Sequence, residues 1–179
     1  QIFDAPEMTD LLGISFTGFE KLVRGIFDWR RHRRGMLTTN YAEGGGFIKS
    51  SPEEPIPDLQ LHYFVAKIVD HARKTVLGHG YSVHVCLLRP VSRGIIRLAG
   101  KEPLDAPVID PNFLGERDDI ERMIRGFRLM RTITAQPALA SGGTREFASS
   151  AKAQTDMQLE QYIRDHADTI YHPVGSCRM

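Results

Sequence analysis

The sequence is poor in cysteine and has no long apolar run. Its 179 residues include two cysteines, Cys86 and Cys177, and a single tryptophan. Two cysteines this far apart cannot build a disulfide framework and match no metal-binding spacing, so a reducing compartment is expected. No stretch approaches the roughly 20 apolar residues that a membrane span needs, and the first residues show no signal-peptide pattern. The sequence therefore predicts a cytoplasmic protein, with peripheral attachment to the inner membrane as the alternative.

The chain also lacks a large excess of charge of either sign. Its formal net charge is +1 at pH 7, which argues neither for nucleic acid nor for an acidic membrane surface as a partner, and no nucleic-acid partner is expected. One run, from Arg30 to Arg34, is strongly basic. We interpret this run as the solvated end of a helix, where the helix dipole favours cations. A polyanion site, or an attraction to anionic lipid, is the alternative.

Three familiar catalytic signatures are absent as well. The glycines at 44–46 lead into a predicted strand rather than a helix, so the chain has no nucleotide-binding fingerprint. No Gly-x-Ser-x-Gly nucleophile elbow is present. His84 and Cys86 would share one face of a strand and could begin a two-ligand metal site, but a packed pair is the favoured interpretation. We expect no metal, because ligand spacing is missing among His62, His71, His79 and His84.

Helical patterns flank a central group of strand patterns. Apolar periodicity predicts a helix over 19–27, with a capping box at Thr17 and Gly35 as its C-cap. A second helix is predicted over 118–135, capped by Asp118 with Glu121. A third follows a capping box that begins at Thr155, and it places His166 on its apolar stripe as a packed residue.

Strands are predicted between the first and second of these helices. Their ranges are 47–49, 59–65, 81–88 and 94–98, whereas 38–46, 51–57 and 141–144 are predicted as loops. The segment 68–80 is open between a short helix and a loop. Helices before and after a cluster of strands predict an α+β fold, a mainly antiparallel sheet packed with helices, in one domain over 1–179.

The chain ends on the pattern Tyr171-His172-Pro173-Val174-Gly175-Ser176-Cys177-Arg178-Met179. A residue before proline is pushed into an extended conformation, so His172 is predicted to end a strand and to be held stiffly. An imidazole in that position suits proton transfer. A structural hydrogen-bonding histidine is the alternative, and a thiol dyad of Cys177 with His172 is a further one.

Residues 172–179 closely resemble the histidine motif of the glucose–methanol–choline (GMC) oxidoreductases, FAD-dependent enzymes that act on alcohols. Three more segments, 35–48, 89–98 and 106–114, are similar to the C-terminal half of the same family and occur in its order. The bacterial alcohol and choline dehydrogenases resemble the chain most.

The resemblance implies roles for five residues. His172 matches the active-site histidine, which accepts the substrate hydroxyl proton as hydride leaves for flavin N5, or holds the alkoxide. Ile170 and Tyr171 would line the same cavity. Asn40 and Glu43 fall in a segment similar to a substrate-facing one, and the Glu43 carboxylate would suit a cationic alcohol such as choline. A solvated loop carboxylate is the alternative for Glu43.

The chain also departs from the family pattern. The Gly-x-Gly-x-x-Gly fold that holds the ADP part of FAD is missing, and Ser176 stands where threonine is common. The family's second catalytic His or Asn would lie beyond Met179. We therefore expect a truncated fragment, the substrate-binding part of an FAD-dependent alcohol dehydrogenase, with no bound FAD and no turnover of its own. Its expected partners are a small alcohol and the missing FAD-binding domain; a non-catalytic ligand-binding module and a structural fragment are the alternatives.

Overall fold

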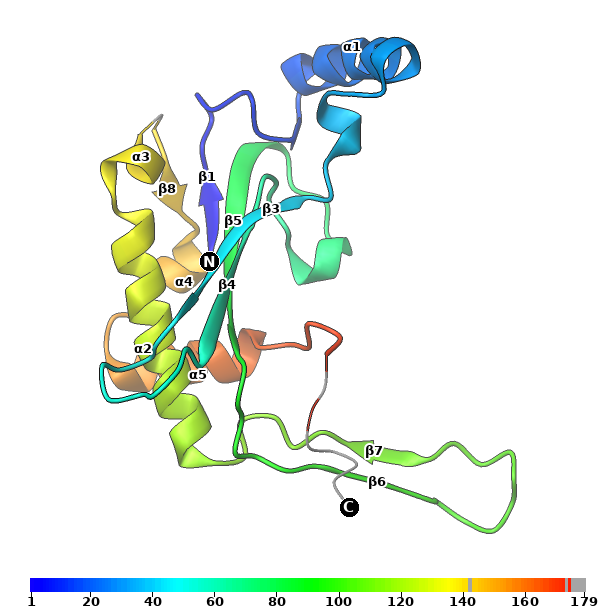
Figure 1. Cartoon of the computed structure of the whole chain (residues 1–179), viewed down its shortest axis with the longest axis vertical. Coiled ribbons are helices and arrows are strands. Elements are labelled where there is room, and N and C mark those ends of the chain that lie inside the picture. The colour runs from blue at the N-terminus through cyan, green and yellow to red at the C-terminus, as the bar shows by residue number, and fades with distance from the viewer. Residues whose placement is uncertain (142, 173, 175–179) are drawn as a thin grey trace.

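A computed structural model of the chain describes residues 1–141, 143–172 and 174, and it shows an antiparallel sheet with helices on one face (Figure 1). The elements follow in the order β1 (Ile2–Asp4), β2 (Gly13–Ile14), α1 (Phe16–His32), η1 (Met36–Thr38), β3 (Ala42–Ile48), β4 (Leu59–Phe64), η2 (Asp70–Ala72), β5 (Gly78–Leu87), β6 (Ile95–Arg97), β7 (Val108–Asp110), α2 (Arg117–Thr134), α3 (Pro137–Ala140), β8 (Arg145–Glu146), α4 (Ala148–Ala151) and α5 (Asp156–His166).

The main sheet has six strands in the order β3-β4-β5-β1-β8, with β2 paired to β5. Every pairing in it is antiparallel. Strands β6 and β7 form a separate two-stranded sheet, which extends away from the main sheet as an arm (Figure 1). The α+β prediction is therefore confirmed, and the predicted strands at 59–65 and 81–88 are the two central neighbours β4 and β5.

The hydrophobic core lies between the main sheet and helices α2 and α5. Side chains alternate between the two faces of a strand, and one face of β4 and β5 carries Leu61, Tyr81 and Val83, all buried. The apolar stripe predicted for α2 is buried against them. A Cβ at Gly126 of this helix would lie 2.8 Å from Leu59 Cδ1, so the helix axis approaches the sheet closely. The buried core residues are Phe3, Ala5, Leu61, Tyr81, Val83, Ile120, Ile124, Phe127, Met130, Ala153, Leu159 and Ile163.

Two buried carboxylates organise the connections between elements. Asp119 accepts hydrogen bonds from the Val91 and Ser92 N–H groups at 2.8 and 2.9 Å, so it fixes the start of the arm against α2. Asp58 accepts the Ser50 N–H and hydroxyl, both at 2.7 Å, and closes the predicted connection between β3 and β4. Burial of Asp58 acts to raise its pKa, but these hydrogen bonds, with a smaller contribution from the charge of Arg122, hold the pKa below its usual value.

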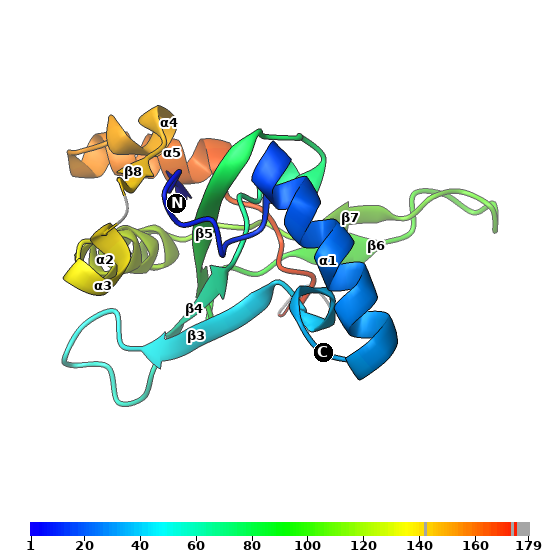
Figure 2. The ribbon, with the colours of Figure 1, turned by 90° about the horizontal axis from the view of Figure 1, so that it is seen from above.

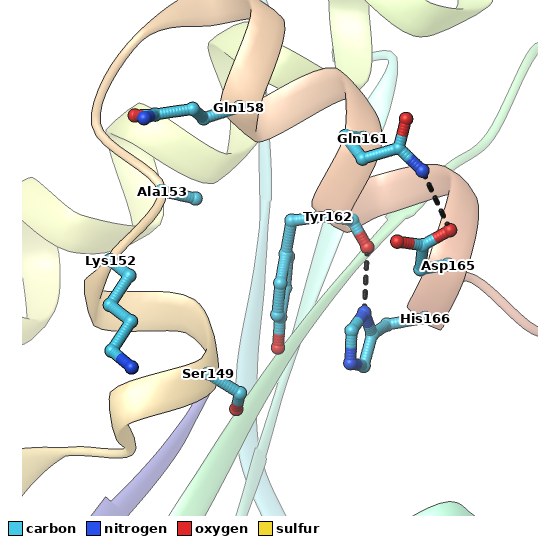
Figure 3. Close-up of a pocket in the computed structure, with 8 residues that line it drawn as sticks. All are labelled: Ser149, Lys152, Ala153, Gln158, Gln161, Tyr162, Asp165 and His166. Carbon is cyan, nitrogen blue, oxygen red and sulfur yellow. Dashed lines mark hydrogen bonds between the residues drawn. The ribbon is translucent and has the colours of Figure 1, made fainter.

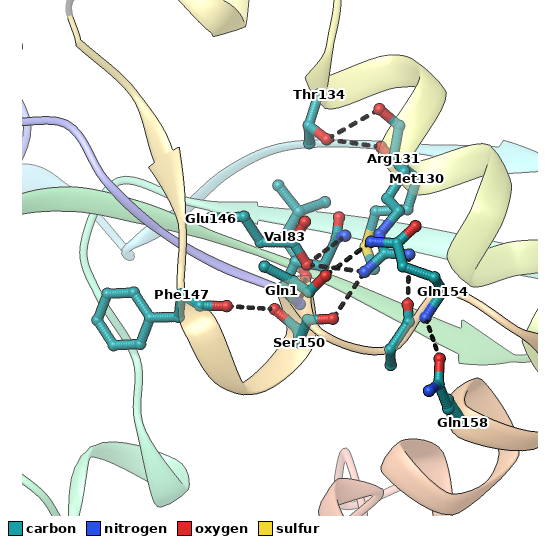
Figure 4. Close-up of polar contacts among 12 residues, drawn as sticks. Gln1, Val83, Met130, Arg131, Thr134, Glu146, Phe147, Ser150, Gln154 and Gln158 are labelled. Atoms are coloured by element: carbon teal, nitrogen blue, oxygen red, sulfur yellow. Dashed lines mark hydrogen bonds and ion pairs between the residues drawn. The ribbon is translucent and has the colours of Figure 1, made fainter.

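Arg131 joins α2 to the segment that follows β8 (Figure 4). Its guanidinium donates to the carbonyl oxygens of Ala153 and Ser150, both at 2.7 Å. It also lies 3.4 Å from Glu146 Oε1 and stacks over the Phe127 ring at 4.9 Å. The side chain is 20% exposed. Arg131 therefore connects α2 to the segment after β8 and is not a solvated charge.

The helix starts predicted from capping patterns are partly wrong. Helix α1 begins after Ser15, whose hydroxyl accepts the Gly18 N–H at 2.9 Å, so Thr17 is not its cap. It ends at Arg33, a left-handed residue with φ of 54°, ahead of Gly35. Helix α2 begins after Glu116 and has no side-chain cap; the predicted cap Asp118 lies inside the first turn and pairs with Arg122 at 2.8 Å. The capping box at Thr155 is confirmed.

The loop predicted over 38–46 is wrong over most of its length. Residues 42–48 form β3, with the three glycines inside the strand, and β3 pairs with β4 along its whole length. Gly45 lies opposite His62, and a Cβ at this position would collide with the Leu61 carbonyl oxygen. Gly45 therefore allows the two strands to approach closely, a contact that is invisible in the sequence. The open segment 68–80 contains η2 and the start of β5.

Candidate active site

One face of the central strands is polar and is not covered by α2. The face opposite the core carries Gln60, His62 and Phe64 on β4, and Ser82, His84 and Cys86 on β5. His62 and His84 are register partners, and His62 Nε2 lies 3.6 Å from Cys86 Sγ. The Phe64 ring stacks near both imidazoles, with its centroid 4.7 Å from that of His84. Two imidazoles, a thiol and an aromatic ring therefore meet on this polar face of the sheet.

His172 approaches this polar face from the end of α5. After α5 the chain crosses to the side of the sheet opposite α2, as both ribbon views show (Figures 1 and 2). The pKa of His62 is lowered first by burial and then by the charge of His172, so the two imidazoles are close enough to interact electrostatically. The strand end predicted at His172 is wrong, because residues 167–172 are irregular. The histidine reaches the sheet on an irregular segment rather than on a strand of its own.

The structure also describes Ile170, Tyr171 and Glu43, three further residues predicted for the site. Ile170 is half-buried, and Tyr171, with φ of 66°, is 66% exposed. Glu43 is exposed on β3, at the register shift between Ala42 and Gly44. It stands two residues before Gly45, the register partner of His62, on the strand next to β4.

Asn40 is exposed just before β3. Within the part of the chain that the structure describes, no hydrogen bond joins it to His172 or His62. Of the motif residues, Cys177 and Ser176 lie outside the described residues, as do Pro173 and Gly175. The proposed thiol dyad therefore stays a prediction.

Sequence reasoning missed His62 and His84 as site residues, although both were considered as metal ligands. A signal was available in the alternation of 59–65, where His62 stands between Leu61 and Tyr63 and therefore off the core face. Its partner across the sheet could not be identified without the register. Among residues 1–141, 143–172 and 174, no group of three or more His, Cys, Asp or Glu could hold a metal ion.

A concavity lies between α4 and α5, away from this polar face (Figure 3). It is an open hollow of about 330 Å³ that includes Tyr162 and His166. His166 is exposed and not packed as predicted; its Nδ1 donates to the Tyr162 carbonyl oxygen at 2.9 Å, and its ring stacks on Tyr162. Gln161 and Asp165 pair with each other at 2.9 Å. Several polar groups of the hollow therefore bond to one another.

The described residues do not fit the dinucleotide half of FAD. A pyrophosphate is usually held by a glycine-rich turn that opens a helix, and the glycines at 44–46 lie inside β3. The three described helices of more than one or two turns begin after Ser15, Glu116 and Thr155, and none follows such a turn. The described residues therefore offer no pyrophosphate-binding turn of this kind.

Comparison with known proteins finds one family and several relatives. Residues 90–179 match the C-terminal part of the family described as GMC oxidoreductase. The chain is 43% identical over 168 residues to an alcohol dehydrogenase [acceptor] from Pseudomonas putida, covering 94% of the chain and 30% of that protein. It is 38% identical over 152 residues to mitochondrial choline dehydrogenase from Mus musculus, covering 85% of the chain and 26% of that protein.

Two solved structures share the fold. Pyridoxine 4-oxidase from Mesorbium loti has a TM-score of 0.66 and 28% identity, over 78% of this chain and 28% of that one. A formate oxidase from Aspergillus oryzae has a TM-score of 0.70 and 18% identity, over 91% of this chain and 34% of that one. The chain spans about a third or less of the length of these relatives.

Proposed function

Because the chain belongs to the GMC oxidoreductase family, we propose that it is the substrate-binding part of an FAD-dependent alcohol dehydrogenase. In this proposal a primary alcohol is oxidised to an aldehyde, with His172 as the acid–base residue. The observation that supports it is the position of His172 beside His62, on the polar face of β4 and β5 that α2 does not cover. His172, the first residue of the family-like motif, and the polar face of β4 and β5 thus lie together.

Oxidation of an alcohol removes a hydride from the carbinol carbon and a proton from the hydroxyl oxygen. The flavin, when bound by the rest of such a protein, supplies the hydride acceptor. In this proposal the chain itself provides the group that accepts the hydroxyl proton. The imidazole of His172 would receive it directly, which requires about 2.6–3.2 Å between its ring nitrogen and the hydroxyl oxygen.

His62 has a supporting role in this proposal. Its pKa is lowered by burial and by the charge of His172, so it stays neutral when His172 gains the proton. A neutral imidazole keeps one donor and one acceptor nitrogen, and it can orient the hydroxyl without opposing the transfer. Two protonated imidazoles this close would repel each other, and the lowered pKa avoids that state.

The side chains around this polar face would also restrict which alcohol can bind. Ile170 and Tyr171 would border the carbon chain of the alcohol beside His172. Glu43 would favour a substrate with a positive charge, because a carboxylate and a cation attract more strongly where water is partly excluded. We propose a small alcohol as substrate and choline as the first compound to assay.

The test uses the complete protein that contains this chain, with the substitution His172→Gln. We expect kcat to fall by about 10²- to 10⁴-fold, the usual contribution of a general acid–base group, with flavin content unchanged. His166→Gln is the matched control, since His166 stacks on Tyr162 at the hollow between α4 and α5. A kcat for His172→Gln equal to that of the control would contradict the proposal.

The isolated 179-residue chain provides a second test. We expect no flavin absorbance in the purified chain and no turnover. Saturable binding of an alcohol to this chain, combined with unchanged kcat in the His172→Gln enzyme, would favour the non-catalytic binding module. Stoichiometric flavin in the isolated chain would contradict the assignment of FAD binding to residues elsewhere.

A further inference from the structure

Helix α1 carries an apolar stripe that the rest of the described chain does not cover. Phe16, Phe19 and Phe27 are 99%, 68% and 70% exposed, and the whole exposed apolar set is Phe16, Phe19, Leu22, Val23, Ile26, Phe27 and Trp29. The helix contacts the rest of the fold through its other side, where a Cβ at Gly25 would lie 2.8 Å from Met36 Cγ. It lies at one end of the molecule, away from α2 and α5 (Figure 1). A stripe this wide is normally buried against something.

The same helix is strongly basic. Residues 16–34 contain six lysines and arginines against two acidic residues. Four of the arginines, Arg30, Arg31, Arg33 and Arg34, lie close together at its C-terminal end, and all four are exposed. The Arg33 guanidinium lies 4.5 Å from the centre of the Trp29 ring. Trp29, the only tryptophan of the chain, thus marks the junction between the apolar stripe and the arginines.

We propose that α1 binds the surface of an anionic phospholipid bilayer, with its apolar stripe in the headgroup–acyl boundary and its arginines among the phosphates. Helices that lie in a membrane surface combine a wide apolar face with Lys and Arg beside it and an aromatic residue between the two. Each Lys or Arg near an anionic surface adds to the attraction.

Two features of α1 favour lipid over a protein partner. The exposed apolar side chains run along most of the helix, from Phe16 to Trp29. The excess of positive charge matches an anionic surface, whereas an apolar protein interface would leave the arginine charges without partners. Among the described residues, no helix is long and apolar enough to cross a membrane.

Trp29 makes the proposal directly measurable in the 179-residue chain. Vesicles of phosphatidylcholine with half phosphatidylglycerol should shift its fluorescence to the blue, and brominated lipids in the same vesicles should quench it. Vesicles of phosphatidylcholine alone, or high salt, should weaken binding at least 10-fold, because the arginines then contribute little. Unquenched Trp29 fluorescence in the presence of bound protein would overturn the proposal.

Double variants separate the apolar from the ionic contribution to vesicle binding. Phe19→Gln with Phe27→Gln should weaken binding more than 10-fold, whereas Leu98→Gln with Leu104→Gln, which removes exposed apolar side chains from the β6–β7 arm, should leave it unchanged. Equal losses from the two pairs would contradict α1 as the membrane contact.

Arg30→Gln with Arg31→Gln should weaken binding about 25-fold, since each Lys or Arg near the surface contributes about fivefold. Arg97→Gln with Lys101→Gln on the arm is the control and should have little effect. The last experiment uses the complete protein. If it fails to bind vesicles that the isolated chain binds, another part of that protein covers α1, and the proposal is wrong.

Discussion

Replacing Arg131 with methionine should destabilise the chain far more than the same change at Arg128. Both arginines lie on α2 and both pair with a carboxylate. Arg131 is 20% exposed and donates to two carbonyl oxygens at 2.7 Å. The Arg128 side chain is 51% exposed, and its partner Asp156 is 69% exposed. The two variants remove the same chemical group from a half-buried and from a solvated position.

The magnitude follows from the interactions that the substitution at Arg131 removes. A hydrogen bond from a charged group contributes about 1.5–3 kcal/mol, and two such bonds to main-chain oxygens disappear. The stacking of the guanidinium on the Phe127 ring adds about 0.5–1 kcal/mol. Methionine keeps most of the packing of the arginine stem. Because water can partly replace these bonds at a side chain that is 20% exposed, we expect less than their full sum, a loss of about 3–5 kcal/mol of the free energy of unfolding for Arg131→Met, against about 0–1 kcal/mol for Arg128→Met.

Urea unfolding followed by circular dichroism measures both values. A shift of the midpoint without a change in the denaturant slope assigns the loss to the folded state. The refuting result is a pair of equal losses, which would mean that water satisfies the carbonyl oxygens of Ser150 and Ala153 as well as Arg131 does. A third variant, Glu146→Gln, then tests how much of the effect comes from the ion pair alone.

Two further predictions concern packing and acid stability. Gly126→Ala should lower the free energy of unfolding by about 1–3 kcal/mol through overpacking against the fully buried Leu59. Gly25→Ala should cost less in the same urea assay, because its Cβ would contact the Met36 side chain, which is only half-buried and can shift. The lowered pKa of Asp58 contributes stability that is present above the unfolded-state pKa, near 4, and is lost as the pH falls through the lower folded-state pKa. Asp58→Asn should therefore flatten the decline of stability below about pH 4, and an unchanged acid limb would show that Asp58 is not its source.

Patterns that depend on neighbours along the chain were readable from the sequence. The capping box at Thr155 needs only residues within one helical turn, and the apolar stripe of α2 repeats at helical spacing. Both are confirmed. The strands at 59–65 and 81–88 were also readable, because runs of β-branched and aromatic residues suit a half-buried sheet.

Features that depend on packing across the fold were not readable. Three glycines in a row indicate a loop by local preference, and only the approach of β4 explains a strand at 44–46. The sequence pattern puts the arginines of α2 off its apolar stripe. Nothing in the neighbouring residues distinguishes the half-buried Arg131, which connects two parts of the fold, from the solvated Arg128. The exposed position of the α1 stripe is equally a matter of what packs against it.

The candidate site divides in the same way. The sequence by itself determined the family and singled out His172, because a motif of consecutive residues survives without its surroundings. Only the tertiary structure decided which groups lie near that histidine. The register of β4 on β5 puts His62 beside His84 and Cys86, and the path of the chain after α5 carries His172 to the same side of the sheet. Register and chain path are set by the burial of the opposite face against α2, and such long-range packing leaves no mark in a short run of residues.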